Sequence, residues 1–293
     1  MMKRNLEKFA PLLFIGPAVF ILLFIVIFPM VYSWALSFAE WNLMRGGDWR
    51  FVGLRNYAQA LLHDPHFYTS LRVTLIYVIL AVGIQFLLGL VIALLLNRPL
   101  KRVGFLRTVL VIPTTMTPVV VGIIWRLLYN PELGTINYFL SLFGFRPLSW
   151  LGDPSLALPS VIMADIWQWT PFMALILLAG LQALPREPYE ASVVDGATTL
   201  QTFRLITFPL LLPTIIVALL LRIMDAFKIF DLIFILTGGG PGMTTEVLSF
   251  YTYRFGFKFF HMGRAAAMSL LLFAILFVIT QIFLKYYRAG EER

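Results

Sequence analysis

The sequence contains no cysteine, and only 13% of its 293 residues are charged. Without cysteine the chain can form no disulfide, no zinc–thiolate site and no thiol nucleophile, although this says nothing about its compartment. Soluble proteins carry about 25% charged residues. A chain that is 60% apolar with so few charges does not fit that class. The composition indicates an integral membrane protein.

The few charged residues are mostly basic, with 23 lysines and arginines against 15 acidic residues and a net charge of +8. A basic excess can indicate nucleic-acid binding, but 27 phenylalanines and a mean hydropathy of +0.85 leave no broad polar face for that partner. We therefore expect no nucleic-acid partner. We expect the basic residues to set the orientation of the chain in a membrane.

Long uncharged stretches predict how often the chain crosses the membrane. A helix that spans a hydrocarbon core of about 30 Å needs roughly 20 apolar residues. Six stretches meet this need, and only the fourth contains a charge, at Asp165. They cover residues 9–39, 73–97, 108–125, 154–184, 205–221 and 265–284. The predicted fold is therefore an all-α membrane protein with six transmembrane helices.

The first stretch follows Lys3, Arg4 and Lys8, as in a signal peptide. It is longer than the apolar region of a signal peptide, which has about 7 to 15 residues. We expect a retained anchor helix, with cleavage near Ser37 to Ala39 as the alternative. The chain then divides into an anchor helix with the first external segment, a membrane core and a short cytoplasmic tail. These parts cover residues 1–66, 67–284 and 285–293.

Basic residues in short loops mark the cytoplasmic side of a membrane protein. The loop from Arg98 to Arg107 contains four basic residues and no acid, so we place it in the cytoplasm. Six spans then put both termini in the cytoplasm, where Lys285 and Arg288 agree with the same rule. The external segments are predicted at residues 40–72, 126–153 and 228–264.

The third span contains residues that break helices. Pro113 and Pro118 remove backbone donors, and Thr114, Thr115 and Thr117 can bond the carbonyls that are left free. These residues indicate a kinked helix that lines a cavity. An ordinary proline-bent helix packed against its neighbours fits the same pattern.

Polar and aromatic residues share one face of the fourth span. Asp165, Gln168, Trp169 and Phe172 lie at positions i, i+3, i+4 and i+7 of a helix. A carboxylate, an amide and two rings suit a sugar, whose hydroxyls need hydrogen bonds and whose C–H surfaces stack on rings. A structural ion pair or a hydrogen bond between helices is the alternative.

Charges of alternating sign occur every three residues at the outer end of the fifth span, at Arg222, Asp225, Lys228 and Asp231. This spacing lets neighbours on one helix pair. By the helical rise, Arg222 lies roughly 20 Å from the inner end of its span, and Asp165 about 16 Å from the outer end of its own. We therefore predict that Arg222 reaches Asp165. The predicted substrate path consists of Asp165, Gln168, Trp169, Arg222 and Asp225.

Three further features do not support enzymatic chemistry. The glycine-rich run at 238–242 lacks the Gly-Lys-Ser/Thr end of a phosphate-binding loop, so we predict a tight external turn. His63 and His66 have no third histidine nearby, which favours a solvated loop over a metal site. The sequence has no serine elbow and no His-Glu-x-x-His motif. We predict no catalytic residue, no cofactor and no metal on this chain.

The loop between the fourth and fifth spans has a composition of its own. Pro185 and Pro188 suit the first turn of a helix, and Glu187 and Glu190 are favourable near its positive end. A run of small residues follows, at Ala191, Ser192, Gly196 and Ala197. Glycine inside a helix costs about 1 kcal/mol relative to alanine, so Gly196 indicates close approach by a partner.

The same loop carries a motif of fixed spacing. Glu190-Ala191-Ser192 is followed after three residues by Gly196, and after nine more by Ile206-Thr207-Phe208-Pro209. This resembles the Glu-Ala-Ala, Gly, Ile-x-Leu-Pro signature of the transmembrane subunits of binding-protein-dependent ABC importers, with Ser192 and Phe208 as departures. Four other segments resemble the carbohydrate-uptake branch of that family, the maltose, trehalose and glycerol-phosphate type. They are Trp150–Pro154, Ala179–Pro185, Phe230–Pro241 and Met262–Ser269.

The resemblance implies the fold of a type I importer permease, with the core at 67–284 and a cytoplasmic coupling loop at 185–207. In that family a short coupling helix, here Tyr189 to Thr199, docks on a cytoplasmic ATPase. The residues implied for ATPase coupling are Glu190, Ala191, Ser192, Asp195, Gly196, Ala197 and Phe203.

The resemblance also implies the partners. They are a second, related permease subunit in a heterodimer, two ATPase subunits that bind ATP and Mg, an extracytoplasmic sugar-binding protein, and membrane lipid. The expected function is import of a carbohydrate or polyol across the cytoplasmic membrane of a prokaryote, without enzymatic activity on this chain. The alternatives are uptake of a non-sugar solute such as glycerol phosphate, a secondary transporter with its ion site at Asp165, and an intramembrane enzyme that uses Asp165 and Asp225.

Overall fold

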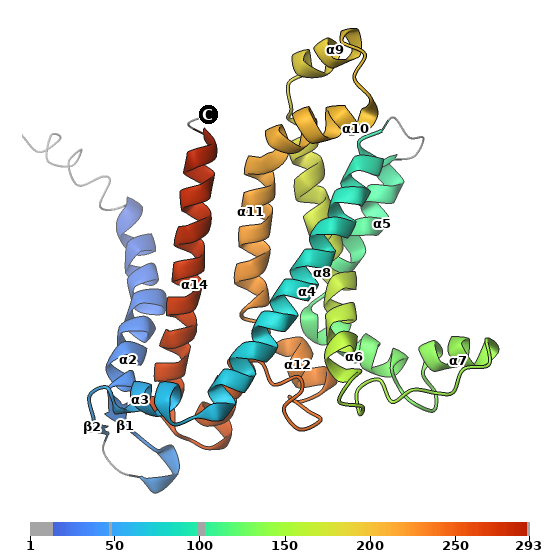
Figure 1. Cartoon of the computed structure of the whole chain (residues 1–293). Helices are drawn as coiled ribbons and strands as arrows, with labels where there is room; N and C mark the ends of the chain where they lie inside the picture. Colours follow the sequence, from blue (N-terminus) through green and yellow to red (C-terminus); the bar gives the residue numbers. More distant parts are fainter. Residues whose placement is uncertain (1–13, 47–48, 99–102, 292–293) are drawn as a thin grey trace, which may run out of the picture. The chain divides into compact units, whose positions relative to one another are not determined.

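The computed structural model describes residues 14–46, 49–98 and 103–291, most of them in helices (Figure 1). The chain packs as two compact units. Unit 1 comprises residues 1–64 and 252–273, and unit 2 comprises residues 65–251 and 274–293. Unit 1 therefore combines the N-terminal part of the chain with a segment from its C-terminal part. The predicted division of the sequence at residue 66 does not include this second segment in the N-terminal part.

Unit 1 contains the first long helix, a small hairpin and the start of the last helix. Residues 14–37 are helical, with a π-helical turn at Leu23–Ile27 and α2 at Phe28–Ser37. β1 (Ala39–Glu40) pairs antiparallel with β2 (Arg50–Phe51), with Ala39 opposite Phe51. The other elements are the 3₁₀ turn Leu43–Arg45, α3 (Arg55–Leu62), the π-helical turn Arg254–Lys258 and the first part of α14 (Met262–Glu291).

Two segments that are far apart in sequence join beside the hairpin of unit 1. Nδ2 of Asn56, a buried residue of α3, donates to the Ala39 carbonyl at 2.8 Å. The backbone N–H of Met262 donates to the Trp41 carbonyl at 3.0 Å. Gly263 lies so close to this strand that an added Cβ would be 1.8 Å from the Ala39 oxygen. Only glycine fits there, so the hairpin and the start of α14 are packed directly on each other.

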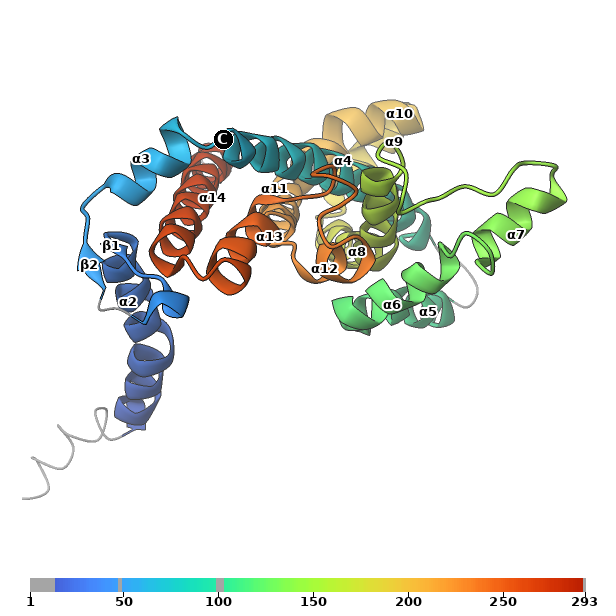
Figure 2. The same cartoon turned by 90° about the horizontal axis from the view of Figure 1, so that it is seen from below.

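Unit 2 is built around α8, the most buried of its long helices. Its elements are α4 (Pro65–Leu96), α5 (Val103–Thr115), α6 (Pro118–Leu128), α7 (Thr135–Leu142), α8 (Ala157–Gln182), α9 (Glu187–Val194), α10 (Thr199–Thr202), the π-helical turn Phe203–Thr207, α11 (Phe208–Ala226), α12 (Asp231–Leu236) and, at its boundary, α13 (Leu248–Tyr253). α8 contacts α4, α5, α6, α11 and α12 (Figure 2). Gly89 of α4 lies against Met173, and Gly180 lies against Thr214 of α11. Small residues at such contacts let membrane helices approach closely.

In the described part of the chain, five helices are long and apolar enough to cross a membrane. They cover residues 14–37, 65–96, 157–182, 199–226 and 262–285. Residues 104–115 and 118–128 form a further candidate, a pair of helices bent by 94°. The six predicted spans correspond to these five helices and to the bent pair, which takes the place of the third span.

The break in the third span follows from its prolines. Pro118 begins α6, and the preceding Thr117 is extended, with φ −67° and ψ 144°, as a residue before proline prefers. The hydroxyls of Thr114 and Thr115 donate to carbonyls one turn back, each at 2.8 Å. The predicted kink is confirmed, and at 94° it separates two distinct helices.

Several predicted boundaries are wrong. α4 begins at Pro65 instead of Val73, because Arg72 is exposed and its long side chain does not stop the helix. The fifth helix begins at Thr199, since it runs on from α10 through the π-helical turn into α11. At its other end α11 stops at Ala226, so Lys228 does not continue the helical series of alternating charges.

The glycine-rich run at 238–242 forms the predicted turn between α12 and α13. The hydroxyl oxygens of Thr237 and Thr245 lie 2.7 Å apart across it, and the Thr245 hydroxyl donates to the Gly240 carbonyl at 2.8 Å. Hydrogen bonds between its two sides hold the turn closed.

Replacing Gly263 with alanine is expected to destabilise unit 1, because the new Cβ would overlap the Ala39 oxygen, 1.8 Å away. Overpacking of this kind typically costs about 1–3 kcal/mol. Gly83→Ala is the control, since nothing lies within 4 Å of its added Cβ and alanine favours the helix. Thermal unfolding of the purified protein in detergent should give a lower Tm for Gly263→Ala alone. Equal Tm values for the two variants would contradict the close packing.

Candidate functional site

An arginine and an aspartate pair between membrane helices of unit 2. Arg222 of α11 and Asp165 of α8 are 1% and 2% exposed, and Nη2 of Arg222 lies 2.5 Å from Oδ2 of Asp165. Oε1 of Gln85 in α4 accepts from Nε of Arg222 at 2.8 Å, and its Nε2 donates to Oδ2 of Asp165 at 2.8 Å. Nη1 of Arg222 donates to Asp225 at 2.9 Å. The predicted contact between Arg222 and Asp165 is confirmed.

The four side chains form one network, named here the Arg222 network. Its buried members depend on each other, because removal of one partner of a buried ion pair typically costs about 3–5 kcal/mol. Asp225 is different: its side chain is 52% exposed, so its pairing with Arg222 contributes little. The guanidinium also lies 5.1 Å from the centre of the Trp169 ring, a favourable cation–π distance. The network therefore fixes α4, α8 and α11 relative to one another.

A cavity of about 90 Å³ adjoins the Arg222 network. All five residues predicted for the substrate path line it: Asp165, Gln168, Trp169, Arg222 and Asp225. The other lining residues are Tyr77, Pro118, Ala226, Lys228, Ile229, Phe230, Asp231 and Leu232. Phe172, which the helical pattern placed on the same face, is not among them. The structure thus brings together the residues predicted for the substrate path. The two alternative interpretations of Asp165, an ion pair and a polar cavity, are both present at this place.

Gln168 connects this cavity with the break in the third span. Its buried Nε2 donates at 3.1 Å to the carbonyl of Met116, which lies between α5 and α6. Its Oε1 is buried and has no hydrogen-bond partner among the residues that the structure describes. An unsatisfied buried acceptor costs about 1–3 kcal/mol. This oxygen can therefore gain from a hydroxyl group in the cavity.

Two residues of this site, Gln85 and Tyr77, were missed in the sequence. Both lie on α4 and both are fully buried. The sequence does contain a signal for Gln85, because an amide in the middle of an otherwise apolar span needs a partner inside the protein. The amide of Gln85 carries no charge, so it does not stand out as a partner for Asp165. Tyr77 left no comparable signal, because tyrosine is common in membrane helices.

The predicted coupling loop contains α9, which begins at Glu187, shortly before the expected start at Tyr189. Pro188 lies in its first turn, and Glu187 and Glu190 lie near its N-terminus, where the helix dipole favours negative charge. The hydroxyl of Ser192 donates to the Tyr189 carbonyl at 2.7 Å, so this side chain forms a hydrogen bond within the loop itself.

The end of α9 differs from the prediction. Asp195 caps the helix, Gly196 has a φ of +69°, and its N–H donates to the Val193 carbonyl at 3.2 Å. The next N–H, of Ala197, donates to the Ser192 carbonyl at 2.9 Å. These bonds define a glycine-terminated helix end. The predicted helix from 189 to 199 is therefore wrong beyond Val194, and Gly196 follows the helix because the turn needs a left-handed φ.

The loop also exposes apolar side chains outside the predicted coupling residues. Val193 is 78% exposed, Val194 is 87% exposed and Leu200 is 73% exposed. Of the residues predicted for ATPase coupling, Glu190, Ala191, Asp195 and Gly196 are exposed, Ala197 and Phe203 are half-buried, and Ser192 is buried. Exposed apolar residues that cluster in this way are typical of a surface that contacts another protein.

The coupling loop lies at the same end of unit 2 as the short basic loop. A cavity of about 650 Å³ is lined both by Leu94 and Arg98 and by Tyr189, Ser192 and other residues of the coupling loop. The hydroxyl of Tyr189 also donates to Oγ1 of Thr207 at 3.1 Å. This bond ties α9 to the start of α11.

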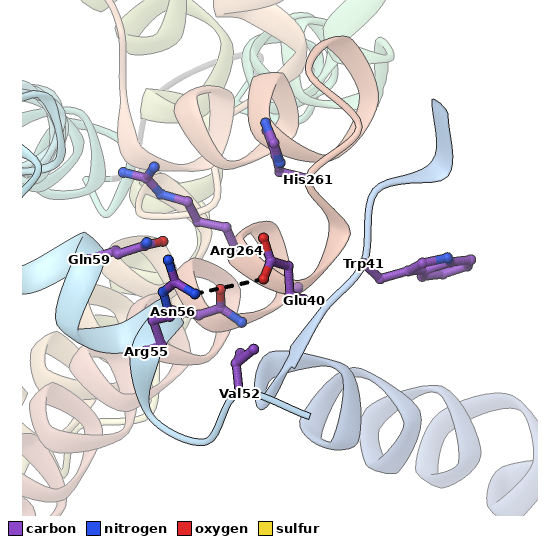
Figure 3. A pocket seen from close by; sticks show the side chains of 9 residues that line it. Glu40, Trp41, Val52, Arg55, Asn56, Gln59, His261 and Arg264 are labelled. Atoms are coloured by element: carbon purple, nitrogen blue, oxygen red, sulfur yellow. Dashed lines mark ion pairs between the residues drawn. The ribbon is translucent and has the colours of Figure 1, made fainter. Parts of the chain in front are cut away.

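A second polar cavity, of about 220 Å³, lies in unit 1 (Figure 3). Its lining residues are Glu40, Trp41, Val52, Arg55, Asn56, Gln59, His261, Gly263 and Arg264. Arg55 and Glu40 are 3.8 Å apart and largely exposed, so they are weakly paired. Arg264 is held by Asp64 at 2.5 Å and lies over the ring of Phe255. The sequence did not predict this cavity, because its walls come from segments that are distant in the chain.

Among the residues that the structure describes, no three histidine, aspartate or glutamate side chains gather as a metal site requires. Nδ1 of His63 lies 3.3 Å from the Ala58 carbonyl at the end of α3.

Comparison with known proteins gives consistent matches. A family model described as the binding-protein-dependent transport system inner membrane component matches residues 85–289. The chain is 44% identical to a probable ABC transporter permease protein of Sinorhizobium fredii, over 91% of this chain and 86% of that relative. It is 41% identical to the trehalose/maltose transport system permease protein of Thermococcus litoralis, over 83% of this chain and 81% of that relative.

A solved structure has the same fold. It is a chain of a bacterial ABC transporter involved in the import of the acidic polysaccharide alginate, with a TM-score of 0.84, 23% sequence identity and 98% coverage of both chains.

A double-mutant cycle tests the buried pair. Asp165→Leu and Arg222→Met should each lower the free energy of unfolding by about 3–5 kcal/mol, because each leaves a buried charge without its partner. The double variant should lose clearly less than the sum of the two, since no unpaired charge remains. Asp225→Asn is the control and should change stability by less than about 1 kcal/mol. Denaturant unfolding in detergent measures all four proteins, and strictly additive losses would argue against the pair.

Proposed function

The chain belongs to the family of binding-protein-dependent transport system inner membrane components, and we propose that it carries a carbohydrate through an ATP-driven importer. The solute is a mono-, di- or oligosaccharide or a polyol, and it enters across the cytoplasmic membrane of a prokaryote. The named relative from Thermococcus litoralis, a trehalose/maltose permease, supports this class of solute.

The observation that carries the proposal is the chemistry of the cavity beside the Arg222 network. The cavity offers the carboxylates of Asp165 and Asp225, the free Oε1 of Gln168 and the ring of Trp169. Sugar hydroxyls donate to such oxygens, and the C–H face of a sugar stacks on a ring. The polar groups are held in place before the solute arrives, because Arg222 binds both carboxylates. Preformed positions lower the entropy loss on binding.

The size of the cavity supports a second permease subunit. Its volume of about 90 Å³ is far below the roughly 300–1,000 Å³ of pockets that bury a small-molecule ligand. This chain therefore supplies one wall of the path. A related permease subunit in a heterodimer supplies the other, and an extracytoplasmic sugar-binding protein delivers the solute.

Energy is proposed to come from two separate ATPase subunits through the coupling loop. The exposed valines of α9, Val193 and Val194, provide an apolar surface on which an ATPase can close. The proposed coupling residues are those implied by the resemblance, namely Glu190, Ala191, Ser192, Asp195, Gly196, Ala197 and Phe203. ATP and Mg bind to the ATPase subunits in this proposal, and this chain performs transport without catalysis. Movement of α9 would swing the spans as packed halves, a rigid-body transition.

The proposed orientation has both termini in the cytoplasm. The basic loop beginning at Arg98 and the coupling loop lie at one end of unit 2. An excess of Lys and Arg marks cytoplasmic loops, and the ATPase subunits need access to α9. Both arguments support a cytoplasmic location for this end.

Uptake by the assembled transporter in proteoliposomes tests the proposal, with the external binding protein, ATP inside, and labelled trehalose or maltose as the probe. Trp169→Ala should slow uptake roughly fivefold, because loss of an aromatic contact costs about 1 kcal/mol. Trp167→Ala is the matched control: it lies on the same helix, is 39% exposed and does not line the cavity.

Two outcomes would contradict the proposal. Equal uptake by the Trp169→Ala and Trp167→Ala variants would remove the cavity from the substrate path. Uptake that continues without ATP but collapses with the proton gradient would favour a secondary transporter over an importer.

Gly196→Leu is expected to abolish uptake and leave the affinity for the binding protein unchanged. Nothing in this chain lies within 4 Å of the added Cβ, so the internal effect is limited to backbone strain of about 1–2 kcal/mol. Any larger loss must arise from a partner that approaches the loop.

Gly144→Leu is the matched control for this variant. Gly144 ends α7, which like α9 has eight residues. It has a φ of +79° and nothing within 4 Å of its added Cβ, and it forms the same pair of helix-ending hydrogen bonds. It lies in a segment predicted to be external. Normal uptake by Gly196→Leu, or an equal loss in both variants, would refute the role in coupling.

A further inference from the structure

The segment that connects α6 to α8 is unusually poor in charge for a loop. Between Tyr129 and Leu156 only Glu132, Arg146 and Asp153 are charged. A connection that lies in water is normally polar and variable in conformation. This composition indicates that part of the segment is not surrounded by water.

The segment nevertheless has a defined structure, centred on Asn137. This side chain is 4% exposed. Its Nδ2 donates to the carbonyls of Pro131 and Leu148 at 3.0 and 2.9 Å, and its Oδ1 accepts from the N–H of Leu148 at 3.1 Å and from Nε1 of Trp150 at 2.9 Å. At the start of the segment, the hydroxyl of Tyr129 donates to the Ser160 carbonyl at 2.9 Å, and burial raises the pKa of Tyr129. The side chains around Asn137 are therefore held in fixed directions.

α7 and the residues beside it direct a row of apolar side chains away from the protein. Six large apolar residues are each more than half exposed: Leu133, Tyr138, Phe139, Leu142, Phe143 and Phe145. In contrast, the residue that α7 buries is the polar Asn137. An exposed apolar patch of this kind normally contacts a membrane or another protein.

The position of α7 favours the membrane. α7 starts only a few residues after Leu128, the last residue of α6, and it runs across the direction of α8 at the end where α8 begins (Figures 1 and 2). α6 itself exposes apolar side chains at Val120, Ile123 and Leu127, and Leu133 follows them in the chain. The row on α7 therefore follows an exposed apolar helix of the bent pair that is long and apolar enough to cross a membrane. Phenylalanine and leucine are also typical of the apolar face of a helix that lies where hydrocarbon meets water.

We propose that α7 is an interfacial helix that lies flat in the outer leaflet of the membrane, with Phe139, Leu142 and Phe143 inserted among the lipid headgroups and upper acyl chains. Helices of this type bury their apolar face about 5–10 Å into the boundary region. α7 then holds the outer ends of α6 and α8 at a fixed depth. Both helices line the cavity of the Arg222 network, through Pro118 and Gln168.

Spin labelling of the assembled transporter in lipid bilayers tests this placement. The chain has no cysteine, so Phe139→Cys and Phe143→Cys each introduce one labelling site, provided that the partner subunits are also free of cysteine. Glu132→Cys serves as the aqueous reference in the same segment. Ile79→Cys, on the exposed side of α4, serves as the reference within a span. Each variant must first retain uptake, which shows that the transporter still assembles.

The measured quantity is the collision rate of each label with oxygen, which concentrates in lipid, and with a water-soluble nickel chelate. Labels at residues 139 and 143 should collide with oxygen at least several times more often than with the chelate, relative to Glu132→Cys. Chelate collisions equal to those at Glu132→Cys would place α7 in water and overturn the proposal. Labels that neither reagent reaches would show that a protein partner covers α7, which would overturn it as well.

Discussion

The buried contact between Arg222 and Asp165 is the constraint on which unit 2 depends. A charged side chain in the middle of a membrane helix costs about 2.5–3.5 kcal/mol even on the most lenient scales, so neither residue is tolerated alone. Three nitrogens of Arg222 each find an acceptor, on Gln85, Asp165 and Asp225. These acceptors come from α4, α8 and α11. The helices must therefore keep one register, and Gly89 at the α4–α8 contact allows the close approach that this register requires.

The same contact determines what the cavity offers to a solute. Oδ2 of Asp165 already accepts from Arg222 and Gln85, so its acceptor capacity is largely used inside the protein. Asp225 is half-exposed and Gln168 has a free Oε1, so these two residues retain hydrogen-bonding capacity for a solute. In the proposed function the buried part of the network acts mainly as support, and the groups at its edge bind the solute. Groups held by such a support are preorganised, which favours binding without added contact area.

Much of this site could be predicted because helical geometry is regular. The spacing from Asp165 to Trp169 fixed one face of α8, and the rise per residue showed that Arg222 could reach Asp165. Gln85 could not be assigned, because no pattern says which two spans pack together. The position at which α9 ends could not be predicted either. Gly196 is compatible with a helix interior or with a left-handed turn, and only the hydrogen bond from Ala197 to Ser192 decides between them. The cavity of unit 1 depends wholly on tertiary contacts.

The geometry also offers a route by which the proposed movement of the coupling loop could reach the cavity. Tyr189 is bonded to Thr207, so α9 is tied to the base of α11, and the helical rise places Arg222 roughly 22 Å further along that helix. α8, which carries Asp165, enters the loop from the other side. Any displacement between the two helices must therefore change the distance between Arg222 and Asp165. Asp225 lies on the same helix as Arg222 and moves with it. In the proposed transport cycle Asp225 thus stays beside Arg222 when the contact to Asp165 opens, although its exposed side chain holds Arg222 only weakly.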